Sequence, residues 1–564
     1  MLLVIVYLIG CLLGGLYSHG LPSRRLAWVL LAATALLCLS YLSAGQNLLP
    51  GLSLFSLSSS ATHSTQEAAA PWHAPIPGLS WLLHLVDSTV ANAFALVTTL
   101  KDSAAAGRVG FALYLLGAAT ILVQPRYGLY LILFGALVGD AVLLPWYPFV
   151  KGFSSPESLF FIDDWLIVSP LELYVVLTAI SWSARAIRQG KWSFRTGPLF
   201  SPALVFAAAL LVGLAYGVGT GGDPRIALWE ARAVFYLVPL LLLTSNLVDT
   251  PAQVTGLLWV ALAAVCIKGI VGSLYYLVVL RGDLNGVEGI AEHGAAVHLN
   301  ALLVTSVGVL LYETSRLKKI LLPLMVPFVL LGYIAMQRRA AFVSVAIAFV
   351  LMLAVLYKQR RRLFWKVAPA FLLLGGGYVA AAWNSQNTLA IPAHAIKSAI
   401  VARQASDRDQ SSNDYRLLEN QNIGATIRQH PLMGVGFGQK YLMAVPLPDL
   451  SRFFEWWEYI THNSILWIWM KAGLVGVLSM LVLIGLAIVS GARAVDRLPA
   501  DELGLVTLAA TLYLVMHFIY ACVDMSWDAA SIVFVGTLMG VVNCAEWIAP
   551  AVVKPERAAA PRRV

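Results

Sequence analysis

Residues 461–476 read THNSILWIWMKAGLVG, and they join a long polar segment to a long apolar one. The apolar run that begins here predicts a membrane helix over 462–490. Its first turn carries His462 and Asn463. The preceding segment, 383–461, is the longest polar loop in the second half of the chain. A polar loop that ends in an imidazole at the rim of a membrane helix is where we expect the chemistry of this protein.

Composition places the rest of the chain in the membrane. The chain has 564 residues, of which 59% are hydrophobic and 12% charged, and its mean hydropathy is +0.78. Apolar runs that recur at this length predict an all-α polytopic membrane protein. The formal charge of +9 does not indicate nucleic-acid binding, because the basic residues cluster in short loops between spans. The five cysteines have no CxxC spacing, and we expect no metal or disulfide role for them.

The hydropathy pattern predicts about fifteen spans. Besides 462–490, these are 1–17, 27–44, 109–123, 128–147, 165–182, 199–217, 228–247, 254–279, 296–312, 320–336, 340–357, 365–382, 503–521 and 529–547. With this count, the clusters of Lys and Arg near 24–25, 185–195, 316–319, 358–366 and 493–497 all lie on the cytoplasmic side, as does the basic tail. The N-terminus and the loop 383–461 then lie on the outer side.

The N-terminal part is less regular. Residues 45–80 form a loop of low complexity, and 81–100 carry a polar stripe that predicts an interfacial amphipathic helix. We therefore divide the chain into an N-terminal part (1–108), a transmembrane bundle (109–382), the large loop (383–461), the C-terminal transmembrane helices (462–548) and a basic cytoplasmic tail (549–564).

Several charged residues lie on the outer side, where topology does not explain them. Arg338 and Arg339 occupy a very short turn between two spans. Glu230 and Arg232 lie at the outer start of another span, and His293 closes the loop 280–295. Arginines at this depth suit a phosphate or diphosphate, whose oxygens pair with the guanidinium fork. Snorkelling toward lipid head groups is the alternative for Arg338 and Arg339.

His462 also has two interpretations. A capping or interfacial histidine is the structural one. A helix N-terminus favours a developing negative charge and keeps a nearby imidazole neutral, which suits a general base. The segment 434–438, GVGFG, lacks the strand and helix of a nucleotide site, so a flexible loop turn is expected there.

Several motifs together resemble the O-antigen ligase and O-antigen polymerase family. They are Asp414-Tyr415-Arg416, the stretch 427–438 (IRQHPLMGVGFG), the stretch 462–466 (HNSIL) and the stretch 471–476 (KAGLVG). Residues 337–341 are similar to the family's SRGA helix start, and Glu230-Ala231-Arg232 to its ExR. The likeness spans roughly 110–545. The chain departs from the pattern at Arg338, at Ala340 and at Lys471, where the family usually has Ser, Gly and Glu.

The resemblance implies a GT-C-like glycosyltransferase in the bacterial inner membrane, with its active face in the periplasm and with no metal or other cofactor. Its donor would be an undecaprenyl-diphosphate-linked glycan, and its acceptor a lipid core or a growing glycan. His462 would be the catalytic base. Arg232, Arg338, Arg339 and Arg416 would bind the donor diphosphate, and Asn463, Glu230 and His293 would orient the acceptor or the base. The loop 383–461 would cover the acceptor groove.

Two other functions stay open. A transporter or flippase of lipid-linked sugars predicts a polar cluster in the middle of the membrane that includes Asp140, Glu172 and Lys268. A non-catalytic partner in a polysaccharide assembly is suggested only by the N-terminal spans. The sequence does not separate ligase from polymerase, and it does not identify the glycan or the acceptor.

Overall fold

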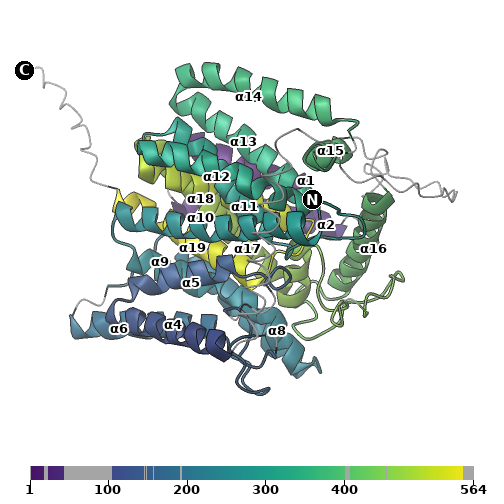
Figure 1. The fold of residues 1–564 in the computed structure, drawn as a ribbon. Helices are drawn as coiled ribbons and strands as arrows, with labels where there is room; N and C mark the ends of the chain where they lie inside the picture. Colours follow the sequence, from purple (N-terminus) through teal and green to yellow (C-terminus); the bar gives the residue numbers. More distant parts are fainter. Residues whose placement is uncertain are drawn as a thin grey trace, which may run out of the picture.

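The computed structural model describes residues 2–17, 23–43, 104–144, 147, 149–156, 158–190, 193–385, 387–400, 407–452 and 454–549. The predicted interfacial helix 81–100, the low-complexity loop and almost all of the predicted tail lie outside these residues. Within them the chain is helical and has no strand, which confirms the predicted fold class. The helices run side by side in one bundle (Figure 1).

The order of the helices follows the predicted spans. The helices are α1 (Leu2–Tyr17), α2 (Ser23–Ser43), α4 (Ala104–Val123), α5 (Arg126–Val138), α6 (Pro170–Arg188), α7 (Phe200–Gly219), α8 (Pro224–Phe235), α9 (Leu237–Leu247), α10 (Pro251–Leu274), the π-helix η2 (Tyr275–Val279), α11 (Ala295–Leu311), α12 (Arg316–Ala335), α13 (Arg339–Gln359), α14 (Arg361–Ala382), the 3-10 helix η3 (Thr388–Ala390), α15 (Ile391–Ile400), α16 (Asp407–Gln429), α17 (Ser464–Arg497), α18 (Glu502–Ala521) and α19 (Ala529–Ile548). In the described residues, ten helical segments are long and apolar enough to cross a membrane, and four shorter helices are apolar. The count of fifteen spans stays a prediction.

The centre of the bundle is formed by the C-terminal helices. Helix α18 is buried over its whole length, and α17 and α19 are buried over most of theirs. Helix α14 lies at the periphery, where Leu372, Leu373 and Leu374 are 67–77% exposed. An apolar surface of this kind is suited to lipid and not to water.

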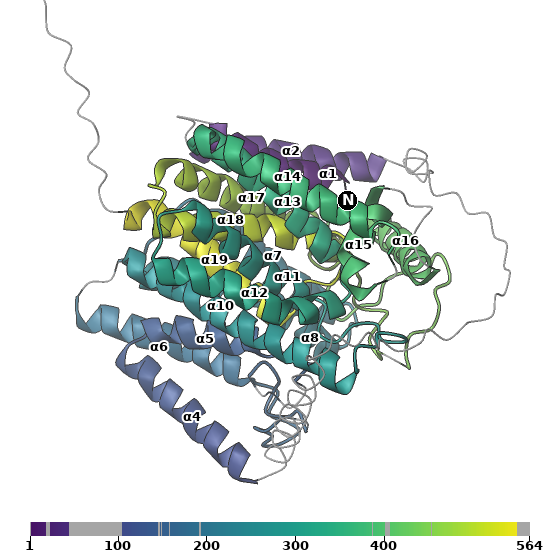
Figure 2. The same ribbon diagram turned by 45° about the horizontal axis from the view of Figure 1, so that its top comes forward.

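The N-terminal helices belong to the same bundle. Helices α1 and α2 run along α17 (Figure 2). The hydroxyl of Tyr7 donates to the carbonyl of Leu481 at 2.9 Å. A Cβ atom on Gly15 would lie 2.7 Å from Cβ of Ala492, so α1 approaches α17 as closely as a glycine allows. The N-terminal pair is thus packed against the helix that carries the central motif.

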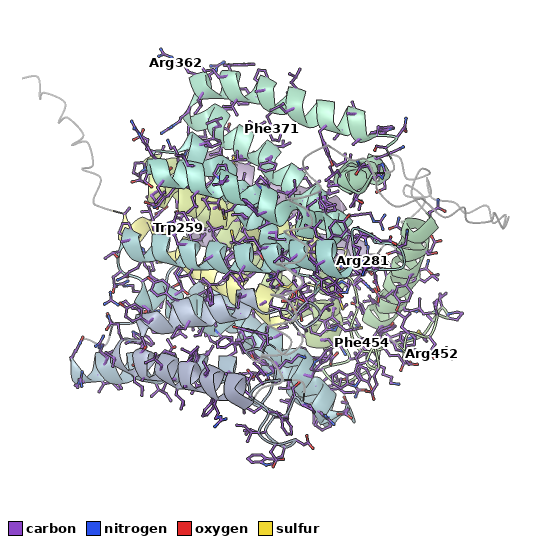
Figure 3. The ribbon with its side chains drawn as sticks, in the orientation of Figure 1. Trp259, Arg281, Arg362, Phe371, Arg452 and Phe454 are labelled. Atoms are coloured by element: carbon purple, nitrogen blue, oxygen red, sulfur yellow. The ribbon has the colours of Figure 1, made fainter. Side chains whose placement is uncertain are left out.

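The two ends of the bundle differ in chemistry. At one end, basic residues of the predicted cytoplasmic clusters pair with acidic residues at neighbouring helix ends: Arg195 with Asp249, Lys358 with Asp496, and Arg497 with Glu546, at 2.6–2.9 Å. Figure 3 shows Arg362 and Trp259 toward this end, and Arg281, Arg452 and Phe454 toward the other, where α16 lies across the bundle. The motif residues His293, Arg338 and His462 gather at that second end.

Candidate functional site

The first turn of α17 connects three segments of the chain. The side chain of Asn463 caps the helix by accepting from the N–H of Leu466 at 3.1 Å. Such a cap stabilises a helix by about 1 kcal/mol. Ser464 donates its hydroxyl to the carbonyl of Asp524 and accepts from the N–H of Ser526, both at 3.0 Å. The motif therefore brings the loop between α18 and α19 next to His462.

The ring of His462 is held by Glu419 of α16. Nδ1 lies 3.2 Å from both carboxylate oxygens of Glu419, and the backbone N–H of His462 donates to the same carboxylate at 2.9 Å. The side chain of Glu419 is 2% exposed and that of His462 is 21% exposed. A carboxylate that accepts from Nδ1 would leave Nε2, on the far side of the ring, with its lone pair. The contact with Glu419 is therefore compatible with a role of His462 as a base.

A second histidine lies beside the first. The ring centres of His293 and His462 are 6.1 Å apart. Nδ1 of His293 lies 2.6 Å from Oδ1 of Asp524. The hydroxyl of Tyr520 donates to Oδ2 of Asp524 at 2.9 Å and to the carbonyl of His293 at 2.5 Å. These bonds fix the loop before α11 against the loop after α18.

Two arginines, Arg416 and Arg338, lie near Asp524 beside this pair of histidines, and Arg339 contacts α16. Nη2 of Arg416 lies 3.5 Å from Oδ2 of Asp524. Arg339 donates to the side chain of Asn413 at 3.1 Å, three residues before Arg416 on α16. Arg338 lies at the N-cap of α13. The Nε atoms of Arg338 and Arg416 are buried without a hydrogen-bond partner. Since buried donors of this kind are costly, both guanidinium groups are suited to a further acceptor.

The cationic groups of the cluster change the pKa of the buried Asp524. Burial would raise the pKa of Asp524, but His293, Arg416 and Arg338 outweigh burial and hold that pKa well below its usual range. Burial and the neighbouring Glu419 raise the pKa of Tyr415, whose ring centre lies 5.7 Å from that of His462. Asp524 is therefore the anionic centre around which the cationic groups collect.

The glycine-rich segment 434–438 packs tightly against α7, α8 and α17, and we call this contact the glycine joint. It is not the flexible turn expected from sequence. Gly434, Gly436 and Gly438 all have positive φ, between 71° and 86°. A Cβ atom on any of them would lie 2.2–2.5 Å from backbone atoms of α17, of α7 or of the residues before α8. Only glycine permits both this backbone conformation and this close approach.

The helical backbone of α17 is interrupted at Gly473, where the glycine joint packs against it. Gly473 has φ 69° and ψ −170° in the middle of the helix. The carbonyl of Met470, freed by the break, accepts from the N–H of Val435 at 2.7 Å, and the N–H of Leu474 donates to the carbonyl of Leu432 at 3.0 Å. The loop thus satisfies the backbone groups that the break exposes, as burial in a membrane protein requires.

Glu230 supports this joint from α8. Its carboxylate pairs with Nζ of Lys471 at 2.8 Å, and both side chains are fully buried. Glu230 also accepts from the N–H of Gly438 at 2.6 Å, and Lys471 donates to the carbonyl of Gln439 at 2.5 Å. The carboxylate of Glu230 is thus engaged within the glycine-rich segment and gives the unusual Lys471 an anionic partner, while its expected orienting role stays a prediction.

Arg232 lies in a separate group. Its guanidinium forms a two-pronged ion pair with Glu172 of α6 and donates to the carbonyl of Ile167 at 2.7 Å. The hydroxyl of Tyr236 donates to the same carboxylate at 3.0 Å. The contacts of the described residues do not connect Arg232 to the histidine cluster. The guanidinium group of Arg232, which the sequence predicts to bind the donor diphosphate, is therefore already paired with Glu172.

The polar residues expected for a transporter do not form one cluster. Asp140 lies 3.9 Å from Lys268, and both side chains are buried. Glu172 pairs with Arg232 instead. Asp140 and Lys268 belong to a group with Glu292 and Asp528, Glu172 belongs to a separate group with Arg232, and the charges on the outer rim converge on His462 and His293.

The sequence interpretation missed the anionic half of the site. Glu419, Asp524 and Tyr520 were not predicted, although they position both histidines. Glu419 follows Arg416 by three residues, which places the two on one face of a helix, and this spacing could have indicated it. The described residues contain no group of three or more His, Cys, Asp or Glu that could hold a metal.

Comparison with known proteins identifies one region of the chain. A model of the O-antigen ligase family matches residues 301–481. The matched region contains Arg338, Arg339, Arg416, Glu419 and His462, and it excludes α1 and α2. No curated protein matches the chain.

Proposed function

The chain carries the domain of the O-antigen ligase family at residues 301–481, and on this premise we propose that it is a membrane glycosyltransferase. It moves a glycan from a polyprenyl-diphosphate carrier to a hydroxyl of an acceptor, as an O-antigen ligase or a polysaccharide polymerase does. The observation that carries the proposal is the pairing of His462 with Glu419 beside a group of arginines.

His462 is the proposed base. The acceptor hydroxyl attacks the anomeric carbon of the donor sugar, and the bond from that carbon to the diphosphate oxygen breaks. The hydroxyl proton passes to Nε2 of His462, and the electron pair leaves with the polyprenyl diphosphate. Glu419 holds the ring in the productive tautomer and stabilises the imidazolium that forms, as a carboxylate does behind other catalytic histidines.

Arg338, Arg339 and Arg416 are the proposed donor site. A leaving diphosphate gains negative charge in the transition state, and preorganised cations lower the energy of that charge. The unpartnered Nε atoms of Arg338 and Arg416 supply donors in the required place. The protein cations would thus do this work without a metal. Arg232, which Glu172 holds, is left out of this donor site.

The proposed active face is the periplasmic side of the inner membrane. The histidine cluster lies at the end of the bundle opposite to the paired basic helix ends, which include Lys358 of α13 and Arg497 of α17. Basic loops are retained in the cytoplasm. Helix α16 lies over the start of α17, so this part of the loop 383–461 is the proposed cover of the site.

The test is glycan profiling of cells that carry His462→Ala or Arg416→Ala in place of the native gene. We expect normal membrane levels of both variants, loss or shortening of the surface polysaccharide and accumulation of its lipid-linked precursor. Single repeat units that remain attached would identify a polymerase, and complete absence from the acceptor a ligase. An unchanged glycan profile of His462→Ala at normal protein level would refute the proposed base.

A further inference from the structure

A cavity of about 830 Å³ separates the N-terminal helices from the proposed site. Its walls are α1, α2, α16 and α17. Most of its lining is apolar, and it includes Val4, Leu37, Ile465, Leu466, Trp469 and Leu481. Its polar lining includes Arg416, Arg428, Asn420 and His462. The cavity therefore combines a long apolar wall with cationic groups and the proposed base.

Helix α2 is docked on α16 at one point of this wall. A Cβ atom on Gly424 would lie 3.0 Å from the hydroxyl of Tyr41 and 3.4 Å from Nη1 of Arg428. The ring of Tyr41 lies 5.6 Å from that of Trp469 on α17. A side chain at position 424 would push these groups apart. The N-terminal helices thus form one wall of the cavity, although they lie outside the region 301–481 that matches the family.

Two polar atoms in the lining lack partners. Nε of Arg416 and Oδ1 of Asn420 are buried and form no hydrogen bond. Arg416 also contacts Asp524, so it faces both the cavity and the histidine cluster. An occupant with an anionic group near Arg416 and an apolar chain along α2 would match both halves of the lining. Charge complementarity and apolar burial together indicate an isoprenoid lipid phosphate.

We propose that this cavity binds the lipid carrier of the donor, with its chain against α1 and α2 and its diphosphate at Arg416, which faces both the cavity and the histidine cluster. The inference rests on the proposed function and extends it, because it gives the N-terminal helices a part in donor binding. Tyr41 and Arg428 lie together beside Gly424, farther along the cavity from Arg416.

Photo-crosslinking tests the position of the chain. The full-length protein in lipid nanodiscs carries p-benzoylphenylalanine at Leu37, which lines the cavity, or at Leu36 or Leu39, which are 67% and 60% exposed and do not line the cavity. The probe is radiolabelled undecaprenyl diphosphate. We expect strong labelling from position 37, at least five-fold above positions 36 and 39. Equal labelling from the three positions would overturn the proposal.

Competition tests the head group. Unlabelled undecaprenyl diphosphate should suppress labelling from position 37, whereas undecaprenol and phosphatidylglycerol at the same concentration should suppress it much less. Arg416→Ala should weaken the competing diphosphate about ten-fold or more, and Arg452→Ala, in an exposed part of the loop, should not. Equal competition by phosphatidylglycerol would show a general anionic-lipid groove and would contradict the assignment.

The two proposals fail separately. Crosslinking measures binding, so His462→Ala should label normally from position 37 even though transfer is lost. If transfer depends on His462 and Arg416 but position 37 is not labelled, the lipid site is wrong and the proposed function stands. If position 37 is labelled and His462→Ala transfers normally, the lipid site stands and the proposed base is wrong.

Discussion

The carboxylate of Glu419 contacts His462 twice, once at Nδ1 of the ring and once at the backbone N–H. This arrangement fixes both the position and the rotation of the imidazole. It also explains why a residue inside the large loop is needed at the start of α17. The loop carries part of the site and is not only its cover.

Glu419→Gln should therefore lower kcat for glycan transfer while KM for the donor changes little. An amide does not hold the tautomer or balance the imidazolium, and a loss of about 10²- to 10⁴-fold is expected for a carboxylate in this role. Glu419→Asp should restore part of the rate. Glu455→Gln, an exposed loop carboxylate, is the control. Full activity of Glu419→Gln would show that the contact is only structural.

The buried pair of Glu230 and Lys471 should contribute mainly to folding. Lys471→Met leaves a buried carboxylate without its cation, which costs about 3–5 kcal/mol. The double variant Glu230→Gln/Lys471→Met should regain much of this loss, and thermal unfolding in detergent measures both. Lys440→Met is the control, since its ion pair with Glu458 is largely exposed and contributes less than about 1 kcal/mol. Additive losses in the double variant would argue against the pair.

Gly473→Ala should destabilise the joint between the loop and α17. The new Cβ would lie 2.2 Å from the carbonyl oxygen of Leu432, and the backbone already has φ 69°. A loss of about 1–3 kcal/mol follows from strain of this kind. Gly375→Ala provides the comparison, because nothing lies within 4 Å of its Cβ position and alanine favours a helix. Thermal unfolding should give a lower midpoint temperature for Gly473→Ala than for the unchanged protein, and no lower midpoint for Gly375→Ala.

Glu292→Gln should change the dependence of stability on pH. Burial, Asp140 and Asp528 raise the pKa of Glu292 to about 8, compared with about 4.3 in an unfolded chain. The folded state then binds more protons than the unfolded state between these values, so the native protein loses stability as pH rises through this window. The variant lacks this loss. Its advantage in unfolding temperature should grow from pH 5 to pH 8, and a constant difference would disagree with the raised pKa.

Arg232→Gln should affect stability more than catalysis. Its fork is occupied by Glu172, so Arg232→Gln and Glu172→Gln should lower the unfolding temperature similarly, and their effects should not add. Transfer by the folded fraction should fall much less than with Arg416→Gln. Loss of transfer in Arg232→Gln alone, with Glu172→Gln active, would instead support the diphosphate role that the family resemblance implies.

The sequence by itself determined the membrane class, the positions of the apolar helices and the separation of basic loops from the motif residues, because each of these is a property of local composition. It also indicated His462, His293, Arg338 and Arg416, which the structure brings together. Local patterns carry no information about partners far along the chain. Asp524 lies 231 residues from His293, and Glu230 of α8 pairs with Lys471 of α17 across eight intervening α-helices in chain order.

Only the tertiary structure decided which charged groups meet. It paired Arg232 with Glu172, placed Glu230 under the glycine joint, and turned α1 and α2 into a wall of the cavity. The physical reason is common to these cases. A charge in a low-dielectric interior requires a nearby partner, and helix packing decides which partner is within reach.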